Sequence, residues 1–209
     1  MKIPSRFLPI AVMILAPAAV RLVPYILGAL GMGNVHDATA FLWNFSPLSA
    51  LFLFGGAKFA ERRSAYLVPL AAMVLSDLGI GLLMKDVSMG LHAMIPVIYG
   101  TYAFIVWLGT KLRESPRAWA IAGAALAGEV VFFAITNFAN WIVQTDTYPH
   151  TVAGLLACYV AALPFFRNAL ISVAVYATVL FGGYALVERK YAAGQMPALA
   201  QNSDRASVA

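Results

Sequence analysis

Residues 118–143 read AWAIAGAALAGEVVFFAITNFANWIV, with Glu129 as the one charged side chain. About 20 apolar residues are enough for a helix to cross the hydrocarbon core of a bilayer, so this stretch predicts a membrane-spanning helix. The rest of the chain is similar: of 209 residues, 62% are hydrophobic and 11% are charged, whereas soluble domains carry about 25% charged residues. The composition excludes a water-soluble globule and predicts an all-α, polytopic membrane protein with room for about six crossings.

The other predicted spans are apolar segments at about residues 7–30, 45–60, 65–84, 91–112 and 167–188. A shorter apolar piece, residues 151–163, is left over. It is too short to cross, and Pro164 follows it, a residue that lacks a backbone donor and breaks or kinks a helix. We therefore predict one domain, residues 1–190, with six transmembrane helices plus a short outer-leaflet or re-entrant helix. The 45–60 segment should hold only a short helix, capped at Ser46.

Basic residues set the predicted orientation, because cytoplasmic loops of membrane proteins carry an excess of Lys and Arg. Four basic clusters fall on one side if each of the six segments crosses once: Lys2 and Arg6; Lys58, Arg62 and Arg63; Lys111, Arg113 and Arg117; Arg189 and Lys190. Both termini are therefore predicted to be cytoplasmic, with residues 191–209 as a disordered tail. These loops explain the excess of 14 Lys and Arg over 9 Asp and Glu, so no nucleic-acid partner is expected.

Four charged side chains fall inside predicted spans, where each charge costs roughly 2.5–3.5 kcal/mol on insertion scales. The helical rise places Asp77 and Glu129 near mid-membrane, and Arg21 and Arg167 nearer the outer surface. The two carboxylates have two interpretations: ion pairs that fix helix packing, or ligand contacts. For the arginines we favour a ligand role, because a planar guanidinium near an outer mouth suits a carboxylate, phosphate or amide group.

A polar stripe runs along the predicted 118–143 helix. Glu129, Thr136 and Asn140 follow helical spacing on one face. Asn137 borders that face, and Trp141 continues it toward the outer loop. The stripe is predicted to look inward. The alternative is that neighbouring helices satisfy these polar groups and no ligand is needed.

The outer end of the last span is expected to contribute to the same site. With a helix break at Pro164, Arg167 and Asn168 fall in the first turn of the final span, where free backbone donors favour an anion or a polar acceptor. The candidate substrate-binding residues are Arg21, Asn44, Asp77, Glu129, Asn137, Asn140, Trp141, Arg167 and Asn168. Polar and aromatic groups that converge on one concave face are what a small-molecule pocket needs.

Catalytic and metal-binding functions are not expected. The sequence holds no glycine-flanked serine, HExxH motif or phosphate-cradling glycine loop. No two of the histidines His36, His92 and His150 form an i, i+4 pair, so neither a metal site nor a cofactor is predicted. The single cysteine, Cys158, cannot form an intramolecular disulfide and is expected to be a small buried apolar residue.

Four strings carry a resemblance to a known family: NFSPLSALFLFGGA at 44–57, PLAAMVLSD at 69–77, TNFANW at 136–141 and AGLLACYVAALPFFRN at 153–168. They resemble the hallmarks of a bacterial membrane-protein family classed as a domain of unknown function. More distantly, size, topology and polar outer loops are similar to the S components of energy-coupling factor (ECF) transporters. That resemblance implies six helices, cytoplasmic termini, capture of a vitamin on the outer face, and a transmembrane coupling subunit with ATPases as partner.

These observations lead to one expected function and one alternative. We expect a substrate-binding or transport protein of the bacterial inner membrane that captures a small, vitamin-like solute from the outside. The alternative is a structural or assembly membrane protein whose polar groups only pack its helices. A pocket of roughly 300 Å³ or more would favour the first function, and a close-packed bundle would favour the second.

Overall fold

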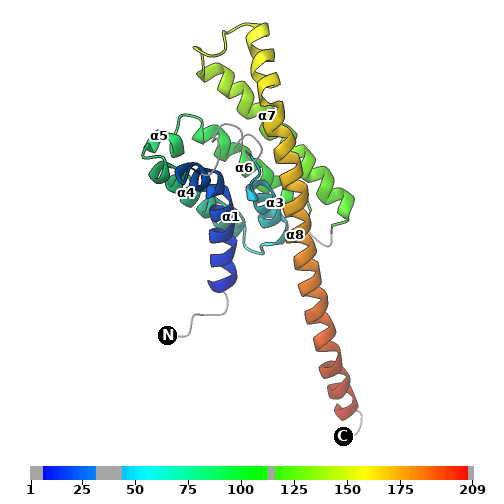
Figure 1. Cartoon of the computed structure of the whole chain (residues 1–209). Helices are drawn as coiled ribbons and strands as arrows, with labels where there is room; N and C mark the ends of the chain where they lie inside the picture. Colours follow the sequence, from blue (N-terminus) through cyan, green and yellow to red (C-terminus); the bar gives the residue numbers. More distant parts are fainter. Residues whose placement is uncertain (1–6, 32–43, 113–115, 207–209) are drawn as a thin grey trace.

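The computed structural model describes residues 7–31, 44–112 and 116–206, and the regular secondary structure in these residues is helical (Figure 1). The helices are α1 (Phe7–Ala29), α3 (Leu48–Lys58), α4 (Arg62–Leu83), α5 (Val87–Gly90), α6 (Ile95–Thr110), α7 (Ala118–Val143) and α8 (Val152–Ala206). This confirms the all-α class. It also confirms that the 45–60 segment holds only a short helix.

Five parts of the described chain are long and apolar enough to cross a membrane: Ala11–Ala29 in α1, α4, Val87–Thr110 across α5 and α6, α7, and Val152–Arg189 in α8. The sixth predicted crossing corresponds to α3, which has 11 residues. At 1.5 Å per residue α3 is about 16 Å long, roughly half the thickness of the hydrocarbon core.

The short helix α3 is the centre of the bundle. Nine of its 11 residues are buried, and it contacts α4, α6, α7 and α8. A helix that is apolar on all sides is stable only where protein surrounds it. Its closest neighbour is α6: a Cβ added at Gly56 would lie 2.1 Å from the carbonyl oxygen of Val106, and one added at Gly109 would lie 2.2 Å from that of Leu53. The two backbones therefore touch.

The predicted break at Pro164 is wrong. The structure has one continuous helix, α8, where the sequence predicted a short re-entrant helix followed by a separate span. Pro17, Pro24 and Pro69 likewise lie inside α1 and α4. In an apolar environment a proline costs a helix one hydrogen bond, whereas ending the helix would leave several backbone groups without partners. Continuing the helix is therefore the less costly solution.

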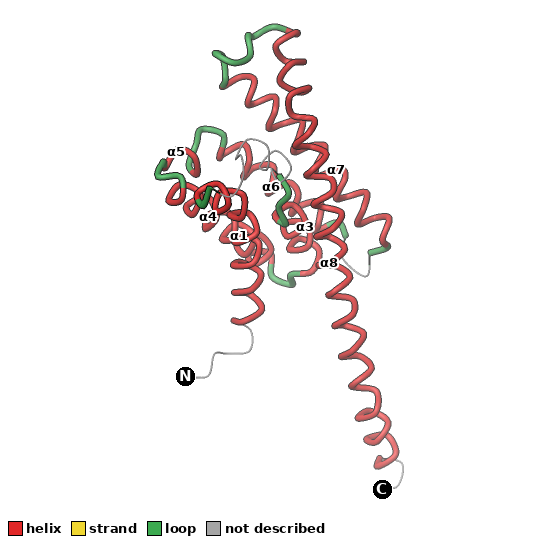
Figure 2. Tube along the Cα trace, viewed as in Figure 1, coloured by secondary structure: helices red, strands yellow, loops and turns green. Residues whose placement is uncertain are grey.

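The continuity of α8 changes the shape of the molecule. Its apolar part has 38 residues, so at 1.5 Å per residue it extends about 57 Å, well beyond a hydrocarbon core of ~30 Å. The α7–α8 hairpin rises above the other helices (Figures 1 and 2). Its two arms are joined by a hydrogen bond of 2.6 Å from the Tyr159 hydroxyl to the carbonyl of Ala134, and by the rings of Phe133 and Phe166, 4.5 Å apart.

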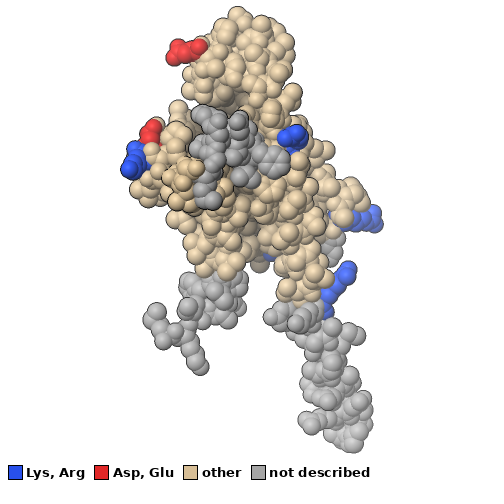
Figure 3. Space-filling model, in the orientation of Figure 1, with Lys and Arg blue, Asp and Glu red and all other residues tan. Residues whose placement is uncertain are grey.

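The start of α1 and the end of α8 lie at the same end of the molecule, and the turn between α3 and α4 points the same way (Figure 1). Lys58 and Arg62 flank that turn, whereas Lys2, Arg6 and Arg113 lie outside the described residues. On the face seen in Figure 3 the charged side chains form a few small, separate groups on an otherwise uncharged surface. The backbone of α8 continues as helix to Ala206, where the sequence predicted a disordered tail from residue 191. The cytoplasmic location of both termini stays a prediction.

Candidate functional site

A polar cavity of about 230 Å³ lies among α1, α3, α4, α6 and α7. It is lined by Arg21, Pro24, Tyr25, Asn44, Phe45, Ser46, Ser49, Met73, Ile80, Met89, His92, Ile98, Tyr102, Glu129, Phe132 and Ala169. Most of these residues come from the end of α1, the start of α3 with the residues before it, the second half of α4 and the first half of α6. The middle of α7 and single residues of α5 and α8 complete the lining. The cavity therefore occupies the half of the bundle away from the basic α3–α4 turn.

A second cavity of about 130 Å³ adjoins the first and shares Asn44, Glu129, Phe132 and Ala169 with it. It runs between α7 and α8 and is also lined by Asn137. Glu129 thus borders both spaces. Taken together, the two volumes reach the lower end of the range of about 300–1,000 Å³ that is usual for small-molecule pockets.

On one side of the larger cavity, Arg21 of α1 forms an ion pair with Asp77 of α4. The same guanidinium nitrogen donates a hydrogen bond of 2.6 Å to the hydroxyl of Ser76. The second carboxylate oxygen of Asp77 accepts a hydrogen bond of 2.8 Å from the hydroxyl of Tyr99. Asp77 is 3% exposed. Its charge is matched and both its oxygens are used, so Asp77 holds α1, α4 and α6 together behind the cavity wall.

On the opposite side, Glu129 of α7 is 2% exposed. Ser49 of α3 and Tyr102 of α6 line the same cavity as Glu129. The carboxyl oxygen Oε1 has no hydrogen-bond partner among the described residues. A buried polar atom without a partner is rare, and it marks either a strained position or a place where a further molecule binds.

The polar stripe predicted on α7 is only partly directed at the cavities. Asn137 lines the smaller cavity, while its side-chain amide donates a hydrogen bond of 2.8 Å to the carbonyl of Phe133. Asn140 instead contacts the Cys158 sulfur of α8 at 3.7 Å. Trp141 donates a hydrogen bond of 3.0 Å to the carbonyl of Pro149 in the hairpin loop. Asn137 therefore lies at a cavity wall. Asn140 joins the two arms of the hairpin, and Trp141 joins α7 to the hairpin loop.

Arg167 and Asn168 were predicted to start a final span. They lie inside α8 instead, because the helix does not break at Pro164. Neither lines the two cavities described above. Arg167 is exposed, and Asn168 is buried. The helix N-terminus expected at this point is absent, since α8 starts at Val152.

Sequence reasoning missed three of the polar residues at the cavity, Tyr25, Ser49 and Tyr102. Each is a hydroxyl group in a mostly apolar stretch of sequence, and such residues carry no pattern that distinguishes a cavity wall from helix packing. One signal could have indicated Ser49. Apart from Ser49 and the terminal Lys58, α3 is apolar. Such a short helix must be surrounded by protein, so its one hydroxyl is expected to face other protein groups.

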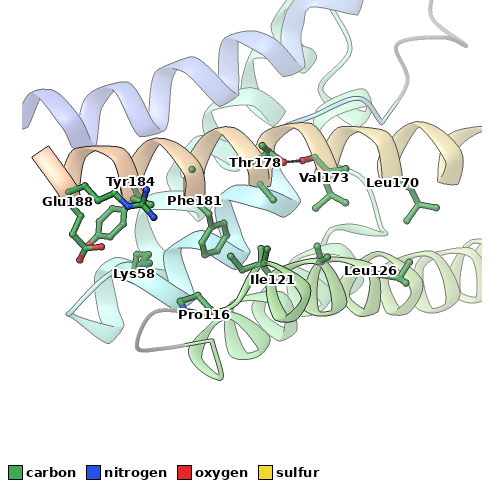
Figure 4. A pocket seen from close by; sticks show the side chains of 18 residues that line it. Lys58, Pro116, Ile121, Leu126, Leu170, Val173, Thr178, Phe181, Tyr184 and Glu188 are labelled. Carbon is green, nitrogen blue, oxygen red and sulfur yellow. Dashed lines mark hydrogen bonds between the residues drawn. The ribbon is translucent and has the colours of Figure 1, made fainter.

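A larger hollow, a groove of about 870 Å³, lies elsewhere, between the first half of α7 and the middle of α8. Figure 4 shows Val173 and Phe181 of α8 opposite Ile121 and Leu126 of α7, with Lys58 and Glu188 at one end. Its walls are mostly aliphatic, and no buried polar atom among its described residues lacks a partner. A groove of this kind suits lipid chains, so we do not take it as the site.

The described residues contain no group of three or more His, Cys, Asp or Glu side chains that could hold a metal ion. His36 lies outside those residues. His150 contacts the carbonyls of Trp141 and Ile142, both at 3.2 Å, at the tip of the hairpin. His92 borders the larger cavity by itself. The Cys158 thiol is buried, as expected.

Helices of spanning length around a cavity with polar lining residues define an all-helical membrane protein. Residues 1–199 match the model of a family described as a family of unknown function (DUF6580), and the chain belongs to that family. No curated protein and no solved structure matches the chain.

Proposed function

We propose that this protein binds a small, vitamin-like solute in the polar cavity and passes it across the bacterial inner membrane, in the manner of an S component. The observation that carries the proposal is the cavity itself. Helix bundles that serve only as structure pack to about the density of organic crystals and contain few voids. Here two adjoining spaces border one buried, incompletely satisfied carboxyl group.

The position of the cavity supports capture from outside. Its lining comes from the half of the bundle away from the basic α3–α4 turn, and the positive-inside rule assigns that turn to the cytoplasm. The solute would then enter from the outer face. An energising partner, a transmembrane coupling subunit with ATPases, follows only from the distant resemblance to S components.

The structural alternative has one observation in its favour. The ion pair between Arg21 and Asp77 satisfies two of the buried charges internally and ties three helices together without a ligand. If Glu129 were satisfied in the same way, nothing in the bundle would require a solute. The two functions therefore differ in what occupies the cavity in the purified protein.

Native mass spectrometry of gently purified protein tests the proposal. Wild-type protein should carry a small molecule of defined mass. Ala169 lines both cavities, so Ala169→Phe should fill the space and remove that molecule. Ala161 is exposed on the same helix, and Ala161→Phe is the matched control that should retain it. A wild-type protein that carries no molecule and binds none from a metabolite extract would favour the structural alternative.

A further inference from the structure

The interior charges of this bundle do not balance. Arg21 and Asp77 neutralise each other, and Arg167, the other arginine predicted inside a span, is exposed. Glu129 is left as a buried acidic side chain with no ion pair among the described residues. An isolated carboxylate in an apolar interior costs several kcal/mol, so such a group takes up either a proton or a cation.

We propose that the cavity selects a small organic cation, a protonated amine, and binds its ammonium group at the carboxyl group of Glu129. The inference rests on the proposed function and names the substrate class of the same site. Oε1 is an acceptor without a partner, in a residue that borders both cavities. An ammonium group offers three donors, so it can bond the Glu129 carboxyl group and still reach a neighbouring oxygen.

The surrounding side chains suit a cation with an apolar body. The ring of Tyr102 is held in place by Phe52, stacked at 4.5 Å between centroids, and by Phe132 at 5.1 Å. Tyr102, Phe132 and Phe45 all line the larger cavity. Aromatic faces attract cations and also pack against apolar groups. An acidic, aromatic pocket therefore favours an amine attached to a compact hydrocarbon or ring.

The same arrangement disfavours the other classes of charged solute. An anion would have to approach a buried carboxylate. Arg21, the one cationic side chain among the described lining residues, is already engaged by Asp77 and Ser76. A metal ion such as Mg²⁺ or Ca²⁺ prefers six or more oxygen ligands. Among the described residues that line the cavity, Glu129 is the one carboxylic acid, and its Oε1 has no hydrogen-bond partner there.

Three one-ring probes of nearly equal shape test the charge preference: benzylammonium, benzyl alcohol and benzoate. We would measure their affinities for wild-type protein in lipid nanodiscs by calorimetry at neutral pH. Benzylammonium should bind about tenfold to hundredfold more tightly than benzyl alcohol, the range of a charge-assisted hydrogen bond. Glu129→Gln keeps the side-chain volume and should abolish that preference. Glu188 is exposed, so the matched control Glu188→Gln should keep it.

A second measurement on wild-type protein covers the case in which Glu129→Gln fails to fold. Infrared difference spectra with benzylammonium, compared with those with benzyl alcohol, should show a change in the carboxylate bands. Equal affinity for all three probes, or bands that do not change, would overturn the cation assignment. A neutral or anionic molecule that co-purifies with wild type and is displaced in Ala169→Phe would also overturn it, while leaving the proposed function intact. A co-purifying organic amine would support both.

Discussion

Replacing Gly109 by alanine should separate the two central helices. A β carbon at this position would lie 2.2 Å from the carbonyl oxygen of Leu53 and 3.0 Å from the α carbon of Gly56. Both atoms belong to the backbone of α3, so no side chain can rotate away. To restore an ordinary contact of about 3.5 Å, α3 and α6 must move apart by more than about 1 Å.

The expected cost follows from this displacement. Overpacking a closely packed interior costs about 1–3 kcal/mol and sometimes more. Because α3 is also enclosed by α4, α7 and α8, its movement disturbs each of those contacts. We therefore predict a loss of about 3 kcal/mol in the free energy of unfolding for Gly109→Ala. Gly56→Ala should cost a similar amount, and the double variant should cost less than twice as much, because both methyl groups push the same two helices apart.

Gly100, in the same helix, provides the control. A β carbon there meets nothing within 4 Å, so Gly100→Ala should be neutral or stabilising by up to about 1 kcal/mol, the usual difference in helix propensity. Reversible unfolding in mixed micelles, followed by circular dichroism, gives both values. If Gly109→Ala is as stable as Gly100→Ala, then α3 and α6 do not touch through their backbones and the central position of α3 is wrong.

Three further predictions concern charge and orientation. Asp77→Asn should lower the free energy of unfolding by about 3 kcal/mol, because it leaves the guanidinium of Arg21 without its counter-ion, and neutralising both residues should recover part of that loss in thermal unfolding. Asp86 accepts hydrogen bonds of 2.9 and 2.7 Å from the amide and hydroxyl of Ser88, which lower the pKa of its carboxyl group. The stabilisation of α5 by Asp86 is therefore fully present above the ordinary pKa of about 3.9. It is lost as the pH falls through the lower pKa that the carboxyl group has in the folded protein. Hydrogen exchange of α5 should show this loss in wild type and not in Asp86→Asn. On a background without the native cysteine, a cysteine at Ser88 should react with an impermeant reagent from outside, and one at Arg117 only after permeabilisation; the opposite pattern would reverse the topology.

Much of the fold follows from the hydrophobicity of the sequence. The helix break predicted at Pro164 is the exception, and its cause is clear. Long apolar runs such as residues 118–143 predict their helices because a bilayer leaves the backbone few other ways to satisfy its hydrogen bonds. The same physics explains the error at Pro164. Rules for helix ends come from chains in water, where a terminated helix bonds to solvent, and that compensation is missing in an apolar environment.

The candidate site could be predicted only in part. Arg21, Asn44, Glu129 and Asn137 line the cavities. Three of these, Arg21, Glu129 and Asn137, lie inside predicted spans, where charges and amides usually face the bundle interior. Which carboxylate pairs with Arg21 depends on how α1 packs on α4, and no local pattern encodes it. Arg167 and Asn168 were assigned to the site through a helix end that does not exist.

The most direct test of the central claim is to locate the solute itself. Electron cryomicroscopy of the wild-type protein in nanodiscs, saturated with the co-purified molecule or with benzylammonium, would give its position. We predict density enclosed by Tyr102 and Phe132, with a polar atom in hydrogen-bonding contact with the Glu129 carboxyl group. Density only in the apolar groove between α7 and α8, or helices closed tightly around Glu129 with no space left, would contradict the account.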